Sequence, residues 1–321
     1  MKIAVLDDYQ GVALAMADWS PILETSEVEV FRDHITDHNA LVERLLPFDV
    51  ICVMRERTPL NADVLGQLPN LKVIASTGPR NRSIDADAAA RRGISILPTG
   101  YFADATVEMT WALILASARR LPQQIESVRS GGWQTDVGSD LKTRTLGVLG
   151  LGKIGARVAA IGNAFGMRVI AWSQNLTPEA AAAHGVQWVD KEALLSQSDY
   201  LTVHLLLSDR TRGIIGSSEL ALMKSTAILI NTSRGPIVDE KALIEALRHE
   251  AIGGAALDVY EVEPLPADHP FRFLRNVLPS PHIGYVSERL YRTFYEDTVR
   301  NLRQWLSDQS NGASPNLNAV T

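Results

Sequence analysis

The run Gly150-Leu151-Gly152-Lys153-Ile154-Gly155 lies between a short apolar stretch, residues 145–149, and a helix-like stretch, residues 156–165. This order predicts a strand, a glycine loop and a helix, which together can hold a dinucleotide pyrophosphate. Gly150 allows the tight turn, Gly152 lets backbone N–H groups approach the phosphates, and Gly155 lets helix and strand pack closely. Lys153 and Ile154, within the same run, are expected cofactor contacts, and the anion is expected at the positive end of the following helix. A glycine loop alone can simply turn a chain, so the surrounding sequence must support this interpretation.

Composition limits the classes of protein to which this chain can belong. Of the 321 residues, 46% are hydrophobic, which is enough to bury two domains. The net charge is −6 and no basic stripe is present, so neither nucleic acid nor a membrane surface is an expected partner. No apolar run could span a bilayer, and the N-terminus reads as a strand, so a cytoplasmic protein is expected. The single cysteine, Cys52, lies in an apolar run and is expected to be a buried thiol.

Strand-like and helix-like segments alternate along the chain, which predicts parallel sheets. The predicted strands of the first hundred residues are 3–6, 49–54, 71–76 and 94–97, with a helix at 85–92. Those of the middle are 145–149, 168–172, 200–206, 227–231 and 254–258. We therefore expect an α/β protein with two doubly wound parallel-sheet domains. A Rossmann cofactor domain, residues 101–285, would be inserted into a flavodoxin-like substrate domain, residues 1–100 plus 286–321.

Two long helices are predicted where the chain passes between these domains. Residues 104–120 form the first, with Asp104 as its candidate cap and Pro122 as its end. Residues 287–306 form the second, which has apolar side chains at helical spacing and returns the chain to the first domain. Residues 309–321 read as a polar tail.

Further chemistry follows three predicted strands at their carboxyl ends, where doubly wound sheets bind ligands. Arg234 lies in the run 231–240 after one strand, Glu263 in the run 257–264 after the next, and His282 in the run 279–284 after a third. Alone, His282 would more often be a satisfied histidine at a strand end, Arg234 a helix-capping or ion-paired side chain, and Glu263 an ordinary loop carboxylate. Their common order after a dinucleotide loop favours a catalytic group beside the nicotinamide.

At this point the sequence resembles the D-isomer-specific 2-hydroxyacid dehydrogenase family, which includes D-lactate, glycerate and phosphoglycerate dehydrogenases. The matching motifs span nearly the whole chain: Ser76-Thr77-Gly78 with Ile84-Asp85, the glycine loop, residues 231–240, residues 258–264 and Pro281-His282-Ile283-Gly284. The resemblance implies that Arg234, Glu263 and His282 are catalytic and that Asp258 contacts the nicotinamide end. Thr232, Ser233 and Gly284, within the same motifs, are further expected cofactor contacts. The resemblance to the family also implies a homodimer, in which the helix at 104–120 lies at the subunit contact.

The chemistry of such a reaction explains why each of these three side chains would be needed. The hydroxyl proton of a 2-hydroxy acid must be removed, and His282 can do so near neutral pH. Glu263 would fix the tautomer of the imidazole, while Arg234 offers a planar fork to the substrate carboxylate. His34 and His38 could face one another as metal ligands on a helix, but a solvated polar loop is the favoured interpretation and no metal is expected.

The first domain is expected to hold the substrate on the loop after the strand at 71–76. Backbone N–H groups of Thr77 and Gly78 and the side chains of Arg80 and Asn81 could bind the substrate carboxylate, with Arg55 nearby. This loop departs from the family pattern, which commonly has a second glycine and an acidic residue here. Arg55 and Arg80 together favour a strongly anionic substrate.

The expected cofactor is NAD, with NADP not excluded. The strand at 168–172 should end in an acidic residue that binds the adenosine ribose of NAD and repels the extra phosphate of NADP. Here it ends in Ser173-Gln174-Asn175, which lacks both that charge and an arginine to attract the phosphate. Weak discrimination between the two cofactors is therefore predicted.

Two other functions remain as alternatives to a 2-hydroxy acid dehydrogenase. Formate dehydrogenase resembles this architecture but typically has glutamine where Glu263 stands. A dinucleotide-sensing corepressor can keep all three catalytic residues and would act by binding. The acidic net charge and the arginines of the first domain favour the enzyme.

Overall fold

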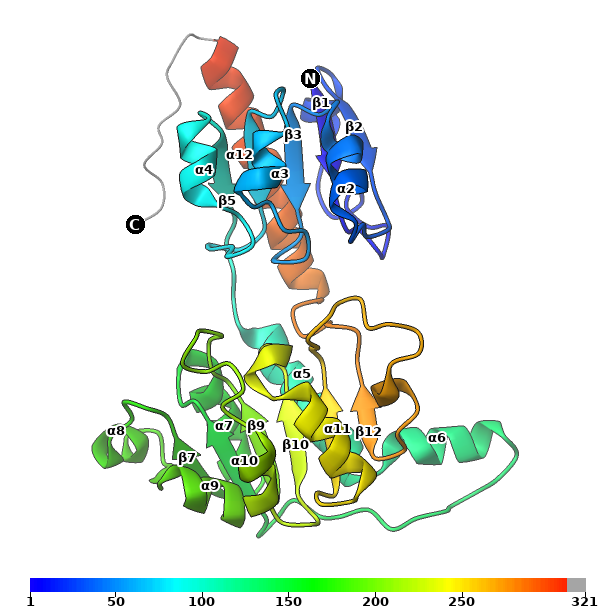
Figure 1. Cartoon of the computed structure of the whole chain (residues 1–321), viewed down its shortest axis with the longest axis vertical. Coiled ribbons are helices and arrows are strands. Elements are labelled where there is room, and N and C mark those ends of the chain that lie inside the picture. The colour runs from blue at the N-terminus through cyan, green and yellow to red at the C-terminus, as the bar shows by residue number, and fades with distance from the viewer. Residues whose placement is uncertain (311–321) are drawn as a thin grey trace. The chain divides into compact units, whose positions relative to one another are not determined.

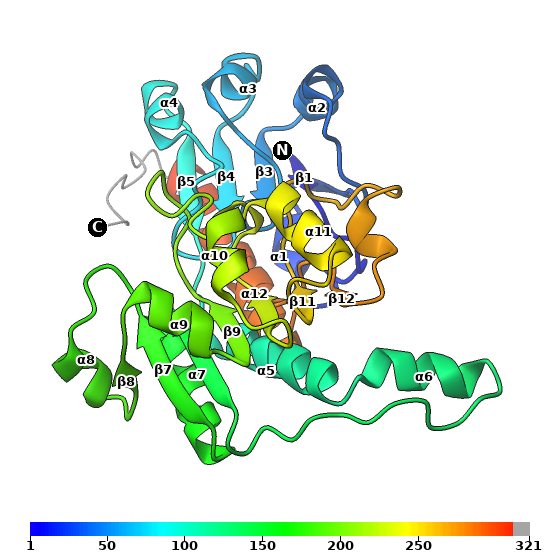
Figure 2. The ribbon, with the colours of Figure 1, turned by 60° about the horizontal axis from the view of Figure 1, so that its bottom comes forward.

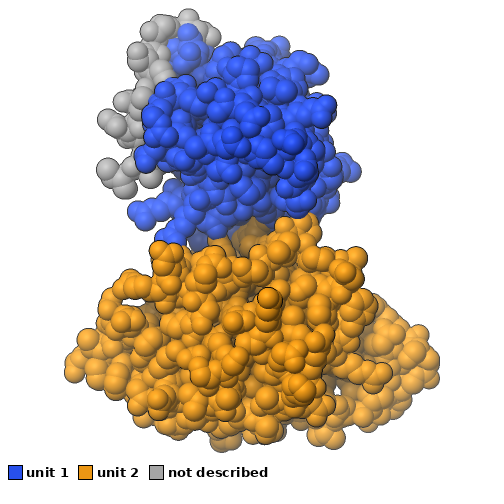
Figure 3. All heavy atoms as spheres, in the orientation of Figure 1, with its two compact units in different colours: residues 1–102, 287–321 blue, residues 103–286 orange. Residues whose placement is uncertain are grey.

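The computed structural model of the chain describes residues 1–310. Its contacts divide the chain into two compact units, Met1–Phe102 with the chain from Ser287, and Ala103–Val286 (Figure 3). Each unit is built on one sheet in which the described strands all pair in parallel (Figure 1). The predicted fold class, two doubly wound parallel-sheet units, is thereby confirmed.

The first unit has a five-stranded sheet of order β2-β1-β3-β4-β5. Its strands are β1 (Lys2–Val5), β2 (Glu27–Val30), β3 (Val50–Val53), β4 (Val73–Ser76) and β5 (Ser95–Pro98). One face is covered by α2 (His38–Leu45), α3 (Ala62–Gly66) and α4 (Ala86–Arg91), and the other by α1 (Ser20–Leu23) and α12 (Glu288–Ser310) (Figure 2). Of the five strands, β2 alone is missing from the sequence prediction. This edge strand alternates glutamate with half-buried valine and has no continuous apolar run.

The second unit has a seven-stranded sheet of order β12-β11-β10-β9-β6-β7-β8. Its strands are β6 (Thr145–Leu149), β7 (Arg168–Trp172), β8 (Gln187–Trp188), β9 (Tyr200–Val203), β10 (Ile228–Asn231), β11 (Gly254–Leu257) and β12 (Val277–Pro279). One face packs on α5 (Asp104–Ala118) and α7 (Lys153–Ala164), and the other on α9 (Lys191–Gln197), α10 (Ser217–Leu222) and α11 (Glu240–Arg248). The short α8 (Pro178–Ala182) precedes β8. The two-residue β8 was too short to show in the sequence pattern.

The helix predicted at 104–120 differs from the structure at both ends. Asp104 does not cap α5; its carboxylate accepts a hydrogen bond of 2.8 Å from Arg157. The chain turns at Arg120, which has a left-handed backbone (φ 48°), and Pro122 lies in the first turn of α6 (Leu121–Arg129). Proline has no N–H to donate, and the first turn of a helix requires none, so Pro122 starts a helix here instead of ending one.

The strand order places all chemistry of the second unit at one sheet edge. It reverses between β6 and β9, which is the topological switch point where open parallel sheets bind ligands. The glycine loop follows β6, and the runs that contain Arg234, Glu263 and His282 follow β10, β11 and β12. Among residues 1–310, no helix is long and apolar enough to cross a membrane. Residues 311–321 of the predicted polar tail lie outside the described part, and residues 309–310 belong to α12.

Candidate active site

The glycine loop has the geometry that its sequence predicts. Gly150 has a left-handed backbone (φ +103°) and its N–H donates to the carbonyl of Trp172 at 2.9 Å, which ties the loop to the end of β7. A side chain at Gly155 would overlap the carbonyl of Gly150. Gly152, the N-cap of α7, has no atom within 4 Å of the place where a Cβ would lie, and no side chain caps this helix. The first N–H groups of α7 are therefore available to an anion, which fits a pyrophosphate.

His282 and Glu263 meet at the same sheet edge. The Nδ1 atom of His282 lies 2.5 Å from Oε2 of Glu263, and both side chains are largely buried. The other carboxylate oxygen, Oε1, accepts the backbone N–H of Tyr260 at 3.0 Å. The imidazole also meets the ring of Tyr285 edge-on, with 5.5 Å between ring centroids. The carboxylate thus fixes the orientation of the ring through Nδ1, and Nε2 remains the ring nitrogen for other chemistry.

Electrostatics link Arg234 to this pair. Burial alone would raise the pKa of the Glu263 carboxyl, but the hydrogen bond and charge of His282, the Tyr260 N–H and the Arg234 guanidinium outweigh it and lower that pKa below its ordinary value. Arg234 is half-buried, and its Nη1 donates to the carbonyl of Ser233 at 2.7 Å. The three predicted catalytic side chains therefore share one region of the second unit.

Asp258 holds the segment on which His282 lies. Its side chain is fully buried and accepts the backbone N–H groups of Ile283 at 2.9 Å and Gly284 at 2.7 Å, together with the Ser280 hydroxyl. Burial raises the pKa of the Asp258 carboxyl, and these donors oppose that rise only in part. His282 itself has a left-handed backbone (φ 53°), a conformation that this set of hydrogen bonds maintains.

The predicted cofactor contacts Thr232 and Ser233 follow β10. The two hydroxyls of Thr232 and Thr110 lie 2.8 Å apart, and Thr110 donates to the carbonyl of Thr106 in α5. Thr232 is therefore the donor of that pair, since Thr110 has only one hydroxyl proton. The Ser233 hydroxyl donates to the carbonyl of Leu205 after β9. Ser173, half-buried, follows β7, where its carbonyl accepts the N–H of Leu176 at 3.0 Å.

The predicted substrate residues lie together in the first unit. Arg55 donates from Nη1 to the carbonyl of Thr77 at 3.0 Å, and its guanidinium carbon lies 5.1 Å from the centre of the Tyr101 ring. The Gly78 N–H donates to Thr99 at 2.7 Å, and the Asn81 amide donates to the carbonyl of Arg55 at 2.5 Å. Arg80 is exposed on the same loop. Asn81 thus braces the loop, and its contact to a substrate stays a prediction.

Tyr260 and Ser280 support the site and were not predicted. The Tyr260 hydroxyl donates to the carbonyl of Ser280 at 2.9 Å and accepts the N–H of Ser280 at 3.0 Å, which joins the loops of Glu263 and His282. An isolated tyrosine and a serine between prolines give no periodic signal. The one signal in the sequence was proximity: Tyr260 lies three residues before Glu263, and Ser280 lies two residues before His282.

Metal binding finds no support in the described residues. None of their histidine, cysteine and carboxylate side chains form a group of three that could hold an ion. His34 binds Asp7 at 2.8 Å, whereas His38 begins α2 and binds Asp63 at 2.9 Å. These two histidines therefore have separate carboxylate partners. The predicted solvated polar loop is wrong for both: the His34 side chain is buried against Asp7, and His38 lies in a helix.

Comparisons with known proteins identify the family of this chain. Residues 111–284 match the model of the D-isomer specific 2-hydroxyacid dehydrogenase NAD binding domain. A glyoxylate reductase of Aeropyrum pernix is 46% identical over 233 residues, 70% of each chain. A D-3-phosphoglycerate dehydrogenase of Methanocaldococcus jannaschii is 38% identical over 90% of this chain and 54% of its own length. The crystal structure of a phosphoglycerate oxidoreductase from Vibrio cholerae superposes with a TM-score of 0.91 at 39% identity, covering 96% of this chain and 99% of that one.

The fold and site define a dehydrogenase that uses a nicotinamide dinucleotide. The chain belongs to the D-isomer-specific 2-hydroxyacid dehydrogenase family. It is accordingly an oxidoreductase that acts between a small 2-hydroxy acid and the corresponding 2-oxo acid.

Proposed function

We propose that this enzyme interconverts a small D-2-hydroxy acid and its 2-oxo acid, with glyoxylate as the first substrate to test. The observation that carries the proposal is the contact of 2.5 Å between His282 and Glu263 beside Arg234. A relative that shares 46% of its residues over 70% of this chain carries the name glyoxylate reductase, which supports the choice of substrate. The carboxylate at Glu263 also argues against formate dehydrogenase chemistry.

In this proposal His282 and Glu263 are the acid–base pair. When the 2-oxo acid is reduced, His282 gives a proton from Nε2 to the carbonyl oxygen, and in the reverse direction it takes the hydroxyl proton. Glu263 stays ionised, holds the ring through Nδ1 and stabilises the positive charge that the ring carries before it donates. A displaced carboxylate would allow the ring to turn away, so the pair acts as a unit.

Arg234 binds and orients the substrate carboxylate. A guanidinium offers two parallel N–H groups to the two carboxylate oxygens, which fixes the plane of the substrate as well as neutralising its charge. Because Arg234 also lies within electrostatic reach of Glu263, it favours the ionised form of that carboxyl.

The coenzyme residues are those of the glycine loop and the neighbouring strand ends. Gly150, Gly152, Lys153, Ile154 and Gly155 would hold the pyrophosphate, and Thr232, Ser233, Asp258 and Gly284 would contact the nicotinamide half. When bound, the nicotinamide supplies or accepts the hydride at C2 of the substrate. We further propose NAD as the preferred coenzyme with weak discrimination against NADP, because Ser173 is neutral and offers neither repulsion nor a positive charge to the extra phosphate.

As the alternative to glyoxylate, we propose a strongly anionic substrate that carries a second acidic group. Arg55, fixed on the Thr77 carbonyl and on the Tyr101 ring, supports this proposal, and exposed Arg80 adds charge on the same loop. Turnover of a phosphorylated or dicarboxylic 2-oxo acid, compared with that of pyruvate, tests it. A clear preference for pyruvate would contradict it.

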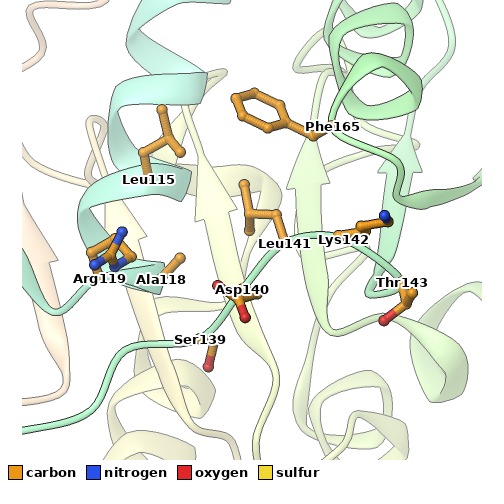
Figure 4. Close-up of a pocket in the computed structure, with 9 residues that line it drawn as sticks. All are labelled: Leu115, Ala118, Arg119, Ser139, Asp140, Leu141, Lys142, Thr143 and Phe165. Carbon is orange, nitrogen blue, oxygen red and sulfur yellow. The ribbon is translucent and has the colours of Figure 1, made fainter.

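A homodimer is proposed from the apolar surface of the second unit. α6 extends away from the rest of its unit in both ribbon views (Figures 1 and 2), and none of its residues is buried. Val128 of α6 and Trp133, in the segment that follows α6, are 56% and 73% exposed. A groove of about 570 Å³ lies at the C-terminal end of α5, where apolar Leu115, Leu141 and Phe165 line it together with polar side chains (Figure 4). A second copy of the chain would cover these apolar side chains. The double variant Val128→Ser/Trp133→Ser should therefore be a monomer, as measured by the mass from light scattering.

The function is tested by the loss of NADH absorbance with a panel of 2-oxo acids: glyoxylate, pyruvate, a phosphorylated one and a dicarboxylic one. Catalytic turnover of at least one supports the proposal. Coenzyme binding without turnover of any would contradict it and favour a dinucleotide sensor.

A further inference from the structure

Glu240 is the first residue of α11 and contacts the loop that contains Glu263 at two points. Its Oε2 atom accepts the backbone N–H of Glu261 at 3.2 Å, and its Oε1 atom lies 3.1 Å from Nε2 of His269. The two partners stand on either side of Glu263 in the sequence. One carboxylate therefore spans the base of the loop segment 261–269.

The ring of His269 is oriented for this contact. Its Nδ1 atom accepts the backbone N–H of Phe271 at 3.3 Å, so Nδ1 presents a lone pair and the ring proton is on Nε2. Nε2–H then donates to Glu240. Phe271 is 2% exposed, and its ring centroid lies 4.9 Å from that of His269, so the imidazole stands on the buried core of the unit.

Glu240 is held equally firmly from its own side. Asp239 caps α11 by accepting the N–H of Ala242 at 3.0 Å, and the apolar face of the helix, with Leu243 and Leu247, is buried. The Glu240 side chain is 23% exposed and that of His269 14%, so water competes poorly for the hydrogen bond between them, whereas the bond from the Glu261 N–H lies at the surface. α11 thus provides a rigid base for the loop.

We infer that Glu240 is a positioning residue that acts through Glu263. Its two hydrogen bonds fix the ends of the segment 261–269, and Glu263, within that segment, is then aligned with His282. Glu240 touches neither reacting atoms nor coenzyme in this account; it sets how often Glu263 is in place. The inference rests on the acid–base role proposed for Glu263.

The test uses graded variants of the full-length enzyme. Glu240→Gln keeps one acceptor oxygen and Glu240→Ala keeps none, so kcat should fall in that order, by about tenfold for alanine, because a misplaced catalytic group loses rate steeply. KM for the 2-oxo acid and the affinity for NADH should change less than about twofold, since a positioning defect acts on the chemical step. Glu245→Gln is the matched control, because Glu245 lies on the same helix, exposed, beside Arg248.

A double substitution separates positioning from general damage. On a Glu263→Gln background, Glu240→Ala should cause a smaller further loss of kcat than in the wild type, since the ionised carboxylate that it positions is already removed. Hydrogen exchange of segment 261–269 should become faster in Glu240→Ala and stay unchanged in Glu245→Gln. Full wild-type kcat in Glu240→Ala, unchanged exchange, or an undiminished loss on the Glu263→Gln background would each overturn the inference.

Failure of the proposed function gives a different result. If the wild-type enzyme turned over none of the 2-oxo acids, the acid–base assignment would fail. The exchange measurement would still decide whether Glu240 holds the segment.

Discussion

The carboxylate of Glu263 lies 2.5 Å from Nδ1 of His282, although the two residues belong to loops after different strands, β11 and β12. Two side chains hold these loops in place. The Tyr260 hydroxyl donates to the carbonyl of Ser280, and the Asp258 carboxylate accepts the N–H groups of Ile283 and Gly284. The site is therefore built into the sheet edge, and substitutions at it have specific consequences.

Glu263→Gln should lower kcat by roughly 10²-fold, the lower range for loss of acid–base assistance. The amide keeps the size of the side chain but cannot stabilise a protonated imidazole. Stopped-flow measurement of NADH oxidation, with NADH affinity determined separately, checks this. A variant that keeps the wild-type rate would show that the pair is only structural.

The same substitution has a pH signature in stability. The pKa of Glu263 is lowered in the folded protein, so the unfolded chain takes up the proton first as pH falls. The contribution of Glu263 is therefore fully present above its unfolded pKa and is lost as pH falls through the folded value. The difference in unfolding free energy between wild type and Glu263→Gln, measured in urea from pH 7 downward, should not shrink until the pH falls below about 4.5. A difference that already shrinks between pH 7 and 5 would contradict this direction of shift.

Arg234→Lys should raise KM for the 2-oxo acid about tenfold, because lysine offers a point charge in place of a planar fork. Affinity for NADH should hold. Steady-state kinetics with glyoxylate checks the first expectation and fluorescence titration the second. An unchanged KM would place the substrate carboxylate elsewhere.

Two glycines of one loop should respond differently. Gly152→Ala should keep the melting temperature, because its Cβ would meet no atom within 4 Å, yet weaken NADH binding about tenfold by occupying the approach of the pyrophosphate. Gly155→Ala should cost about 1–3 kcal/mol of stability, because the new methyl overlaps the Gly150 carbonyl. Equal loss of stability in both variants would argue against this account of the loop.

His204, at the end of β9, gives a stability prediction outside the acid–base pair. Burial lowers its pKa to about 4, and its Nε2 atom has no hydrogen-bond partner among the described residues. Between the ordinary value of 6.5 and about 4, the unfolded chain binds the proton and the folded one does not, so stability falls with falling pH over that window. His204→Asn, which does not titrate, should flatten this slope in urea unfolding at pH 7 and 4.5. An unchanged slope would contradict the burial of this ring.

The sequence predicted both sheets because central parallel strands are continuous apolar runs, as in β6 and β7, whose bounds matched residue for residue. It did not show β2, whose valines alternate with glutamates on a sheet edge, nor the break between α5 and α6. A proline such as Pro122 can follow the end of one helix or lie in the first turn of the next, and the sequence does not distinguish the two. The left-handed backbone at Arg120 ends α5 and makes Pro122 part of α6.

For the site, the sequence named Arg234, Glu263 and His282 through order and motif. It could not show what holds them. The hydrogen bonds of Tyr260, Ser280 and Glu240 join segments about 20 residues apart, and polar side chains with such partners carry no periodic pattern. Structure is needed to see that these residues support the loops.

The central claim is that His282, held by Glu263, transfers the proton during 2-oxo acid reduction. The most direct measurement is the single-turnover rate of NADH oxidation with the best 2-oxo acid of the panel, in wild type and in His282→Gln at saturating coenzyme. We predict a fall of roughly 10²- to 10⁴-fold in the variant with NADH affinity preserved. An undiminished rate in His282→Gln would contradict the account.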